Sequence, residues 1–353
     1  MAQPGEGVLE CRQIGGRIRQ VCNFAYPLRL INPHFSPLQS TYPARLDEDS
    51  QQQELADSDN KVNQKFTYYP SGNFMLTYGG GLVHGDHIRL SVKVGYKVAL
   101  LMLTQGTTKV FPKRNGRQPS TLISNTTNLN PNQTYQTIVC SVAPSALLCI
   151  LPDPVTCFQK AHYHQRQSVH LEDPDTSSLI LLDWFTSGRM SRGEHWDFDV
   201  YSSMNVVTTA SKSGSETKDT KESRSLIVRD ALLLDSKNML SFKTQLSSYN
   251  VIGYLLVLGP GVAVVADVFR NIHEVQKIRP FNPALKTHVG HDPNSDDAKV
   301  TWSVSEVSES GVVGIAVRFT GPSADLLKRW LKKHLSPLRS IIGDSAFDVF
   351  YYN

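Results

Sequence analysis

The chain has 353 residues, of which 40% are hydrophobic, so it is long enough to bury a sizeable core. Its 36 Lys and Arg against 32 Asp and Glu give a net charge of +4. Without a basic stripe and interleaved aromatic residues, this modest balance argues against nucleic-acid binding.

The N-terminal stretch MAQPGEGVLECRQIGG lacks the apolar core of a signal peptide. No stretch approaches the roughly 18 apolar residues of a membrane span, so no membrane partner is expected. Five cysteines form no C-x-x-C pair, which favours reduced thiols. We therefore expect a cytoplasmic protein.

The first strand signals follow a polar segment. Residues 41–61 are acidic and rich in glutamine, and they are expected to form a loop insertion because they can bury little apolar surface. Residues 65–69 and 73–78 then alternate apolar and polar side chains, which predicts two short strands.

Residues 79–111, GGGLVHGDHIRLSVKVGYKVALLMLTQGTTKVF, are the most informative stretch. Residues 87–94 alternate as in a half-buried strand, and 98–103 are a continuous apolar run, consistent with a strand buried on both faces. Gly85 and Gly106 sit where tight turns favour positive φ. A rigid sheet would thus position the polar groups of the strand ends, which are His84, Asp86, His87, Thr104, Gln105, Thr107, Thr108 and Lys109.

Further short apolar-alternating runs follow along the chain, at residues 135–142, 146–151, 164–171, 178–184, 195–207, 224–234, 301–307 and 312–319. Their spacing, and the scarcity of long helical patterns, predict a mainly β protein. Residues 211–223, rich in Ser, Lys and Glu, are expected to be a second loop insertion. Residues 281–299, with two prolines and an Asp cluster, are expected to be a third.

Two segments have helical periodicity. Residues 266–277 place apolar side chains such as Phe269 on one side. In residues 323–335 an apolar stripe that includes Leu327, Trp330 and Leu331 lies opposite basic side chains. Ser323 is placed to cap this second helix and Pro337 to end it.

Asp86 admits two interpretations. Gly80 and Gly85 have the spacing of a phosphate loop, but Asp86 and His87 follow where that motif needs Lys and Ser or Thr, so nucleotide binding is not expected. Asp86 either lines a polar passage or docking surface, or caps a backbone N–H in an Asx-type turn.

The turn at residues 104–109 offers hydroxyl, amide and ammonium groups but no activated nucleophile. Its side chains either satisfy backbone groups of the turn or, in the case of Gln105 and Thr108, face an internal water-filled path.

Asp183 lies inside the apolar run LLDWF at residues 181–185. A buried carboxylate is costly unless it is paired or solvated, and Arg189 in the following turn is the obvious partner. Alternatively, Asp183 and Glu194 face an internal cavity, where they would attract a divalent cation through weak contacts that suit transit.

Two histidine pairs are candidate metal ligands. His162 and His164 share one face of a strand, with His170 on that face if the strand continues. His288 and His291 lie beside Asp292. Imidazole with carboxylate suits Ni²⁺ or Zn²⁺, but neither pair has a third ligand in sight and zinc-finger spacing is absent, so surface positions are favoured.

Three motifs resemble, in sequence, order and rough spacing, those of the urease accessory protein family UreD, called UreH in some bacteria. Residues 79–111 are similar to the family elements GG-[LIV]-x-GGD and T-T/Q-x-[AG]-[ST]-K-[VF]. LPDPVTCF at 151–158 resembles L-P-x-P-x-I-x-F, and GRMSRGE at 188–194 resembles G-R-x-x-x-G-E. The chain departs from the family at His84, often a glycine there, and in its C-terminal Phe350-Tyr351-Tyr352.

The resemblance runs from about Asn23 to the C-terminus and implies one domain over residues 1–353, with residues 1–22 a flexible N-terminus. It implies an elongated, mainly β body of many short strands, wound helically in two layers, with two α-helices, one of them C-terminal.

The resemblance also implies a non-enzymatic scaffold that docks on apo-urease and binds the accessory protein UreF, through which the GTPase UreG joins. Ni²⁺ would be cargo in transit, and no cofactor would be permanently bound. The acids assigned to the nickel path are Asp86, Asp183 and Glu194, and the other path or motif residues are His84, Gln105, Thr108, Lys109 and Arg189.

Two other function classes stay open. A β-rich carbohydrate hydrolase would use Asp183 and Glu194 as a carboxylate pair, at a separation of roughly 5–9.5 Å across a wide groove. A nickel-storing metallochaperone would bind Ni²⁺ tightly and stoichiometrically. An enclosed tunnel would argue against the hydrolase.

Overall fold

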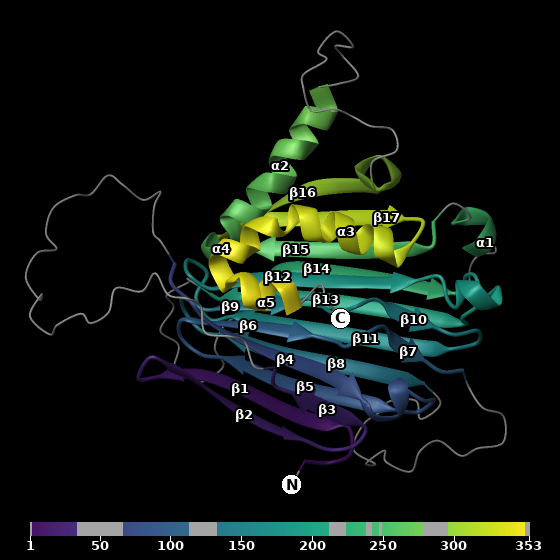
Figure 1. The fold of residues 1–353 in the computed structure, drawn as a ribbon, viewed down its shortest axis with the longest axis horizontal. Helices are drawn as coiled ribbons and strands as arrows, with labels where there is room; N and C mark the ends of the chain where they lie inside the picture. Colours follow the sequence, from purple (N-terminus) through teal and green to yellow (C-terminus); the bar gives the residue numbers. More distant parts are fainter. Residues whose placement is uncertain are drawn as a thin grey trace, which may run out of the picture.

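The computed structural model describes residues 2–33, 66–112, 133–211, 224–237, 242–246, 249–278 and 296–349. Two stacked β-sheets form most of this part of the chain (Figure 1). The seven-stranded sheet has the order β14 (Arg224–Asp235), β13 (Val200–Ala210), β11 (His162–Leu171), β8 (Thr134–Val142), β5 (His87–Val94), β1 (Glu6–Ile14) and β2 (Arg17–Phe24).

The ten-stranded sheet has the order β16 (Thr301–Glu309), β17 (Val312–Gly321), β15 (Val251–Leu258), β12 (Ser178–Thr186), β9 (Leu147–Ile150), β6 (Val98–Leu103), β4 (Tyr69–Thr77) and β3 (Leu28–Ile31). Two short strands complete it, since β10 (Val155–Cys157) pairs with both β12 and β7 (Thr108–Val110).

The chain winds as a coil through the two sheets. From β4 to β12, strands of the ten-stranded sheet alternate along the chain with β5, β8 and β11 of the seven-stranded sheet, and neighbours within each sheet are parallel. The prediction of a mainly β body, wound helically in two layers, is therefore confirmed.

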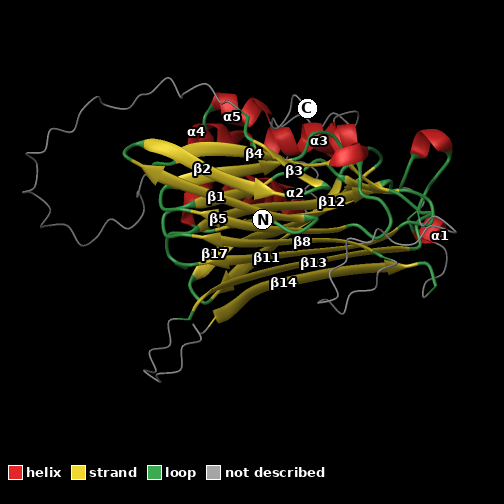
Figure 2. Ribbon diagram, turned by 90° about the horizontal axis from the view of Figure 1, so that it is seen from below, coloured by secondary structure: helices red, strands yellow, loops and turns green. Residues whose placement is uncertain are grey.

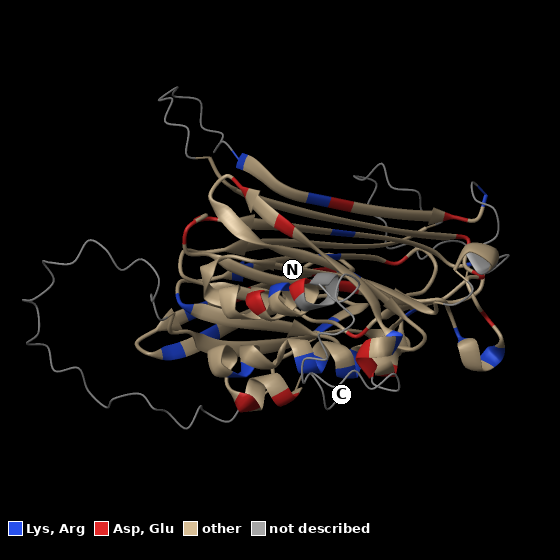
Figure 3. Ribbon diagram, turned by 90° about the horizontal axis from the view of Figure 1, so that it is seen from above, with Lys and Arg blue, Asp and Glu red and all other residues tan. Residues whose placement is uncertain are grey.

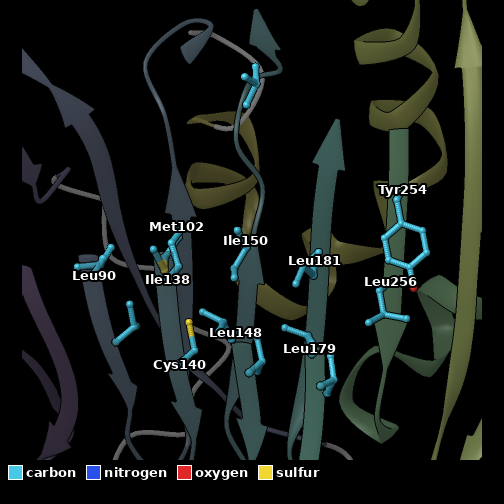
Figure 4. Close-up of a cluster of buried hydrophobic side chains, with 14 of the residues drawn as sticks. Leu90, Met102, Ile138, Cys140, Leu148, Ile150, Leu179, Leu181, Tyr254 and Leu256 are labelled. Carbon is cyan, nitrogen blue, oxygen red and sulfur yellow. The ribbon is translucent and has the colours of Figure 1, made fainter. Parts of the chain in front are cut away.

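The period-two patterns determine which side chains enter the core between the sheets. β5 alternates, with Leu90 turned into that core. β6 is buried on both faces, because Leu100 and Met102 face the other sheet while Leu101 faces the helices. Figure 4 shows the core between the sheets, with labelled side chains that include Leu90, Ile138, Leu148, Leu181 and Leu256.

Helices cover the other face of the ten-stranded sheet (Figure 2). The longer ones are α2 (Ala263–Ile278) and α3 (Ala324–His334), and the short ones are α4 (Arg339–Ile342) and α5 (Asp344–Val349). Helix α1 (Phe242–Gln245) lies apart from them, beyond the strand ends (Figure 1). The hydroxyl of Ser323 accepts the N–H of Leu326 at 3.3 Å at the start of α3. Pro337 follows in η6 (Ser336–Leu338). Both predicted helices are confirmed.

Several predicted boundaries are wrong. The expected flexible N-terminus, residues 1–22, contains β1 and most of β2, because β1 pairs in parallel with β5 and turns Leu9 into the core. Residues 65–69 and 73–78 contribute to one strand, β4, rather than two. The strand expected at 195–207 begins only at Val200. β15 was not predicted.

The predicted loop insertions fall largely outside the described residues. Residues 41–61 lie wholly outside, as does 211–223 apart from Ser211. Of 281–299, only η5 (Asp296–Lys299) is described. The C-terminal residues 350–352 are outside as well.

Charges of both signs are interspersed over the sheets and helices (Figure 3). All five cysteines are free, and only Cys22 is exposed. Within the described part of the chain, no helix is both long enough and apolar enough to cross a membrane.

Candidate functional site

A row of polar side chains, which we call the polar row, runs through the apolar space between the sheets. On the seven-stranded sheet, Gln165 lies in register with Gln136 and Ser203, and Asn205 with Gln167 and Asp230. On the ten-stranded sheet, Tyr254 lies in register with Asp183 and Arg318. Burying this many polar groups lowers the stability of the fold unless they are hydrogen-bonded, so a row of this kind is a candidate functional site.

Asp183 lies at the centre of the polar row and is buried. The amides of Gln165 and Asn205 reach across from the other sheet and donate to its carboxylate at 3.0 and 2.7 Å, and the hydroxyl of Ser203 also donates to it. These donors are neutral, so they hold the carboxylate in place without cancelling its charge.

Burial raises the pKa of the Asp183 carboxyl. The hydrogen bonds from Ser203, Asn205 and Gln165 oppose this rise in pKa, and the nearby carboxylate of Asp230 adds to it. Two carboxyl groups therefore face the same interior space, and that of Asp230 is paired with Arg318.

The predicted ion pair between Asp183 and Arg189 is wrong. Arg189 pairs with Glu194 instead, with Nε donating to Oε2 at 2.8 Å and Nη2 donating to Oε1. The Arg189 guanidinium also lies 4.0 Å from the centroid of the Phe158 ring. The reason is geometric: Asp183 points between the sheets, whereas Arg189 lies beyond the end of β12.

The expectation that Glu194 shares a cavity with Asp183 is wrong for the same reason. Besides Arg189, Glu194 accepts the N–H of Gln159 at 3.3 Å, and the hydrogen bond from Arg189 lowers the pKa of Glu194. The GRMSRGE motif thus closes a turn against the LPDPVTCF motif. The hydrolase alternative loses the carboxylate pair on which it depended.

The turn at residues 104–109 is held by the LPDP motif. Thr104 Oγ1 accepts the N–H of Asp153 at 2.8 Å, and the Asp153 carboxylate accepts the N–H of Gly106 at 3.0 Å. Lys328 of α3 forms an ion pair with Asp153 at 2.8 Å. Gly106 has φ of +74°, which favours glycine. These contacts fix the turn, and with it Gln105 and Thr108, at one end of the polar row.

Three adjoining spaces follow the polar row. The turn cavity, of about 450 Å³, is lined by Gln105, Thr107, Thr108 and Lys109 among others. The neck, of about 20 Å³, shares Thr104, Thr108 and Gln136 with the turn cavity and adds Gln165, Gln167 and Asp183. The edge cavity, of about 450 Å³, shares Asp183 with the neck and continues to Asp230, Tyr254 and Arg318.

Asp86 and His84 line none of these three spaces. Asp86 is buried in the turn before β5, where its carboxylate accepts the N–H of Val83 at 2.8 Å. Burial raises the pKa of Asp86 to about 6, although the hydrogen bond from Val83 opposes the rise. Of its two interpretations, the structure supports the one in which Asp86 caps a backbone N–H.

The histidines of β11 face away from the polar row, on the outer side of the seven-stranded sheet. His162 Nε2 lies 2.9 Å from Asp199, the ring of His164 stacks on Tyr135 with 5.0 Å between centroids, and His170 Nδ1 lies 3.2 Å from Thr208 Oγ1. No three His, Cys, Asp or Glu side chains of the described ranges gather in a metal-binding arrangement. His288 and His291 lie outside those ranges.

Sequence reasoning missed most of the polar row. In β11 only the histidines were predicted to be functional, yet Gln165 and Gln167 lie on the opposite face of the strand. Val169 and Leu171 share that face and are apolar, so it is the face that enters the core. This alternation along the strand could have identified the two glutamines. Asp230 and Arg318 carried no comparable signal, because their proximity depends on how the edges of two sheets meet.

The sequence matches known proteins over most of its length. The family model described as UreD urease accessory protein matches residues 45–348. The chain is 30% identical over 277 residues to urease accessory protein D of Oryza sativa subsp. indica, covering 76% of this chain and 80% of the relative. It is 29% identical over 290 residues to urease accessory protein 4 of Cryptococcus neoformans var. grubii, covering 78% and 80%. It is 30% identical over 274 residues to urease accessory protein UreD of Sorangium cellulosum, covering 78% and 70%.

Proposed function

The chain belongs to the UreD family of urease accessory proteins, which act in urease maturation and are not catalytic enzymes, and we propose that it conducts nickel to urease. In this proposal the chain docks on apo-urease and gives Ni²⁺ a sheltered route through the polar row to the urease active site. Ni²⁺ is cargo, and no cofactor stays bound.

The observation that carries the proposal is the polar row with its three adjoining spaces. Hydroxyl, amide and carboxylate oxygens line them from Thr108 at one end through Asp183 to Asp230 at the other. Such oxygen ligands bind Ni²⁺ more weakly than imidazole or thiolate ligands would. Weak ligands suit a route, because a tight site would trap the ion.

The neck determines how an ion would pass. A volume of about 20 Å³ holds about one water molecule, so a fully hydrated ion does not fit. Gln136, Gln165 and Asp183 offer oxygen atoms at this point, and they would replace the waters that the ion sheds. The ion would thus exchange ligands stepwise between the two larger cavities.

Membership of the family supports partners within the urease machinery. We propose that the chain works in the cytoplasm and binds a UreF-like accessory protein, through which a UreG-like GTPase joins. The GTPase would deliver Ni²⁺ to the complex, and the polar row would carry it onward.

The proposal is tested by blocking the route. Thr108→Trp fills the boundary between the turn cavity and the neck, and Asp183→Ala removes the central carboxylate. Both variants should lower urease activation in cells while they stay soluble and co-purify with urease and the UreF-like protein. The matched control is Thr137→Trp, which puts the same bulk on the outward face of β8.

The decisive outcome is separation of nickel delivery from assembly. If Thr108→Trp and Asp183→Ala lose solubility and partner binding in step with activation, the polar row is only structural. If Thr137→Trp lowers activation as much as Thr108→Trp does, the loss does not come from the route.

A further inference from the structure

One ion pair bridges the two sheets at the end of the polar row. Arg318 of β17 donates to the carboxylate of Asp230 on β14, and both side chains line the edge cavity. β14 is the edge strand of its sheet, and β17 lies next to the edge strand β16 of the other. The ion pair therefore stands where the sandwich ends, at the edge cavity.

The two partners differ in exposure. The side chain of Arg318 is 63% exposed, whereas that of Asp230 is 14% exposed. The Arg318 guanidinium also lies 5.4 Å from the centroid of the Tyr254 ring, over the row that leads to Asp183. A long, largely exposed arginine in an ion pair of this kind gains little net stability from it, so the side chain can move away at small cost.

The charges make this movement consequential for a cation. With Arg318 in place, its guanidinium neutralises the carboxylate of Asp230, and this positive group stands at the end of the polar row. With Arg318 withdrawn, Asp230 and Asp183 act on the edge cavity without an opposing charge. Fixed charges at a narrow opening control which ions enter it and how fast.

We propose that Arg318 is a gating residue of the edge cavity: paired with Asp230 it closes this end of the route to divalent cations, and it opens the route by releasing Asp230. This inference rests on the proposed route for nickel. The inference adds a closed state of the free chain, in which Ni²⁺ neither enters nor leaves through the edge cavity.

The test uses two substitutions that break the same ion pair. Arg318→Gln leaves Asp230 without its arginine and should lower the Ni²⁺ concentration for half-maximal activation of apo-urease by the reconstituted complex. Asp230→Asn leaves the arginine charge at the opening and should raise that concentration. We expect each shift to be about threefold or more, in opposite directions, because the charge at the opening changes sign. Arg318→Lys keeps the charge and should stay near the unmodified protein.

A structural role for the ion pair gives another pattern. If it only ties the sheets together, Arg318→Gln and Asp230→Asn lower stability and activation together, in the same direction, and the gate is refuted. An unchanged nickel dependence in both variants also refutes it. Arg270→Gln is the matched control, because it breaks an ion pair with Glu306 on the other side of the ten-stranded sheet. Thermal unfolding of each variant shows whether it is folded.

The Thr108→Trp variant tests the route independently of the gate. If Thr108→Trp lowers activation while neither substitution at the ion pair shifts the nickel dependence, the route stands and the gate is wrong. If Thr108→Trp has no effect, the route itself is wrong and the gate is refuted with it.

Discussion

Asp86 carries a carboxyl group whose pKa is set by burial and not by a charged partner. Burial raises its pKa from an ordinary 3.8 to about 6. The folded protein therefore holds this proton in a pH range where the unfolded chain has lost it. The contribution of Asp86 to stability is fully present below about pH 4 and is lost as the pH rises through about 6.

Asp86→Asn should remove this pH dependence, because asparagine can still accept the N–H of Val83 but does not ionise. Relative to the unmodified protein, the variant should gain up to about 3 kcal/mol of unfolding free energy between pH 4 and pH 7. Urea denaturation at a series of pH values measures the difference. A difference that stays flat between pH 4 and pH 7 would contradict the pKa assignment.

Glu194 was expected on the nickel path, but the structure makes it the partner of Arg189. Glu194→Gln should lower the unfolding free energy by about 1 to 2 kcal/mol, because a charge-assisted hydrogen bond becomes a neutral one. Urease activation per folded molecule should not change. A specific loss of activation at unchanged stability would put Glu194 back on the path.

Sequence reasoning found the central acid of the site but not its surroundings. Asp183 stood out because an acid inside an apolar strand needs a partner. The nearest cation along the chain, Arg189, was the wrong partner, since the true ones come from β11 and β13 of the opposite sheet. Which strands face each other across a sandwich is not encoded locally.

Helix α3 is the element that closes the core on the outer face of the ten-stranded sheet. Trp330 is 1% exposed, and its ring packs among those of Phe269, Trp302 and Phe319 at 5.5 to 5.8 Å between centroids. Trp330→Ala should lower the unfolding free energy by about 3 to 5 kcal/mol, because the neighbouring rings cannot collapse into the cavity.

Chemical denaturation of Trp330→Ala tests this packing, and Arg329→Ala on the same helix is the control. Arg329 is 60% exposed in its ion pair with Asp296, so its loss should leave the unfolding midpoint nearly unchanged. An unchanged midpoint for Trp330→Ala would mean that α3 is peripheral to the fold.

Local pattern sufficed for some elements and failed for others. β5 and β6 were predicted at their observed bounds, because one alternates strictly and the other is a short apolar run between turns. β15 is also a short apolar run, Val251–Leu258, yet it lies in the middle of the ten-stranded sheet and was not predicted. β1 was missed because its pairing with β5 spans about 80 residues of chain, which no local pattern reports.

On the scale of the whole molecule, the polar row joins two cavities at different ends of the sandwich without a dedicated metal site in the described residues. We expect the isolated chain to bind Ni²⁺ no tighter than micromolar, because its row offers only oxygen ligands. Isothermal titration calorimetry measures this affinity. A stoichiometric nanomolar site would favour the storage alternative, and the double substitution His162→Ala, His164→Ala would then show whether β11 holds it.

A sheltered route also requires both of its ends to be covered. The turn at residues 104–109 limits one end, and the edges of β14 and β16 limit the other. In the complex with urease and the UreF-like protein, hydrogen exchange should slow at both ends compared with the isolated chain, because each backbone region becomes shielded from water. Protection at one end alone would leave the ion path open to solvent after assembly.

In that case Ni²⁺ would exchange with free metal, and a chelator added to the assembled complex should stop activation. If both ends are protected, the same chelator should act only on nickel that has not yet entered.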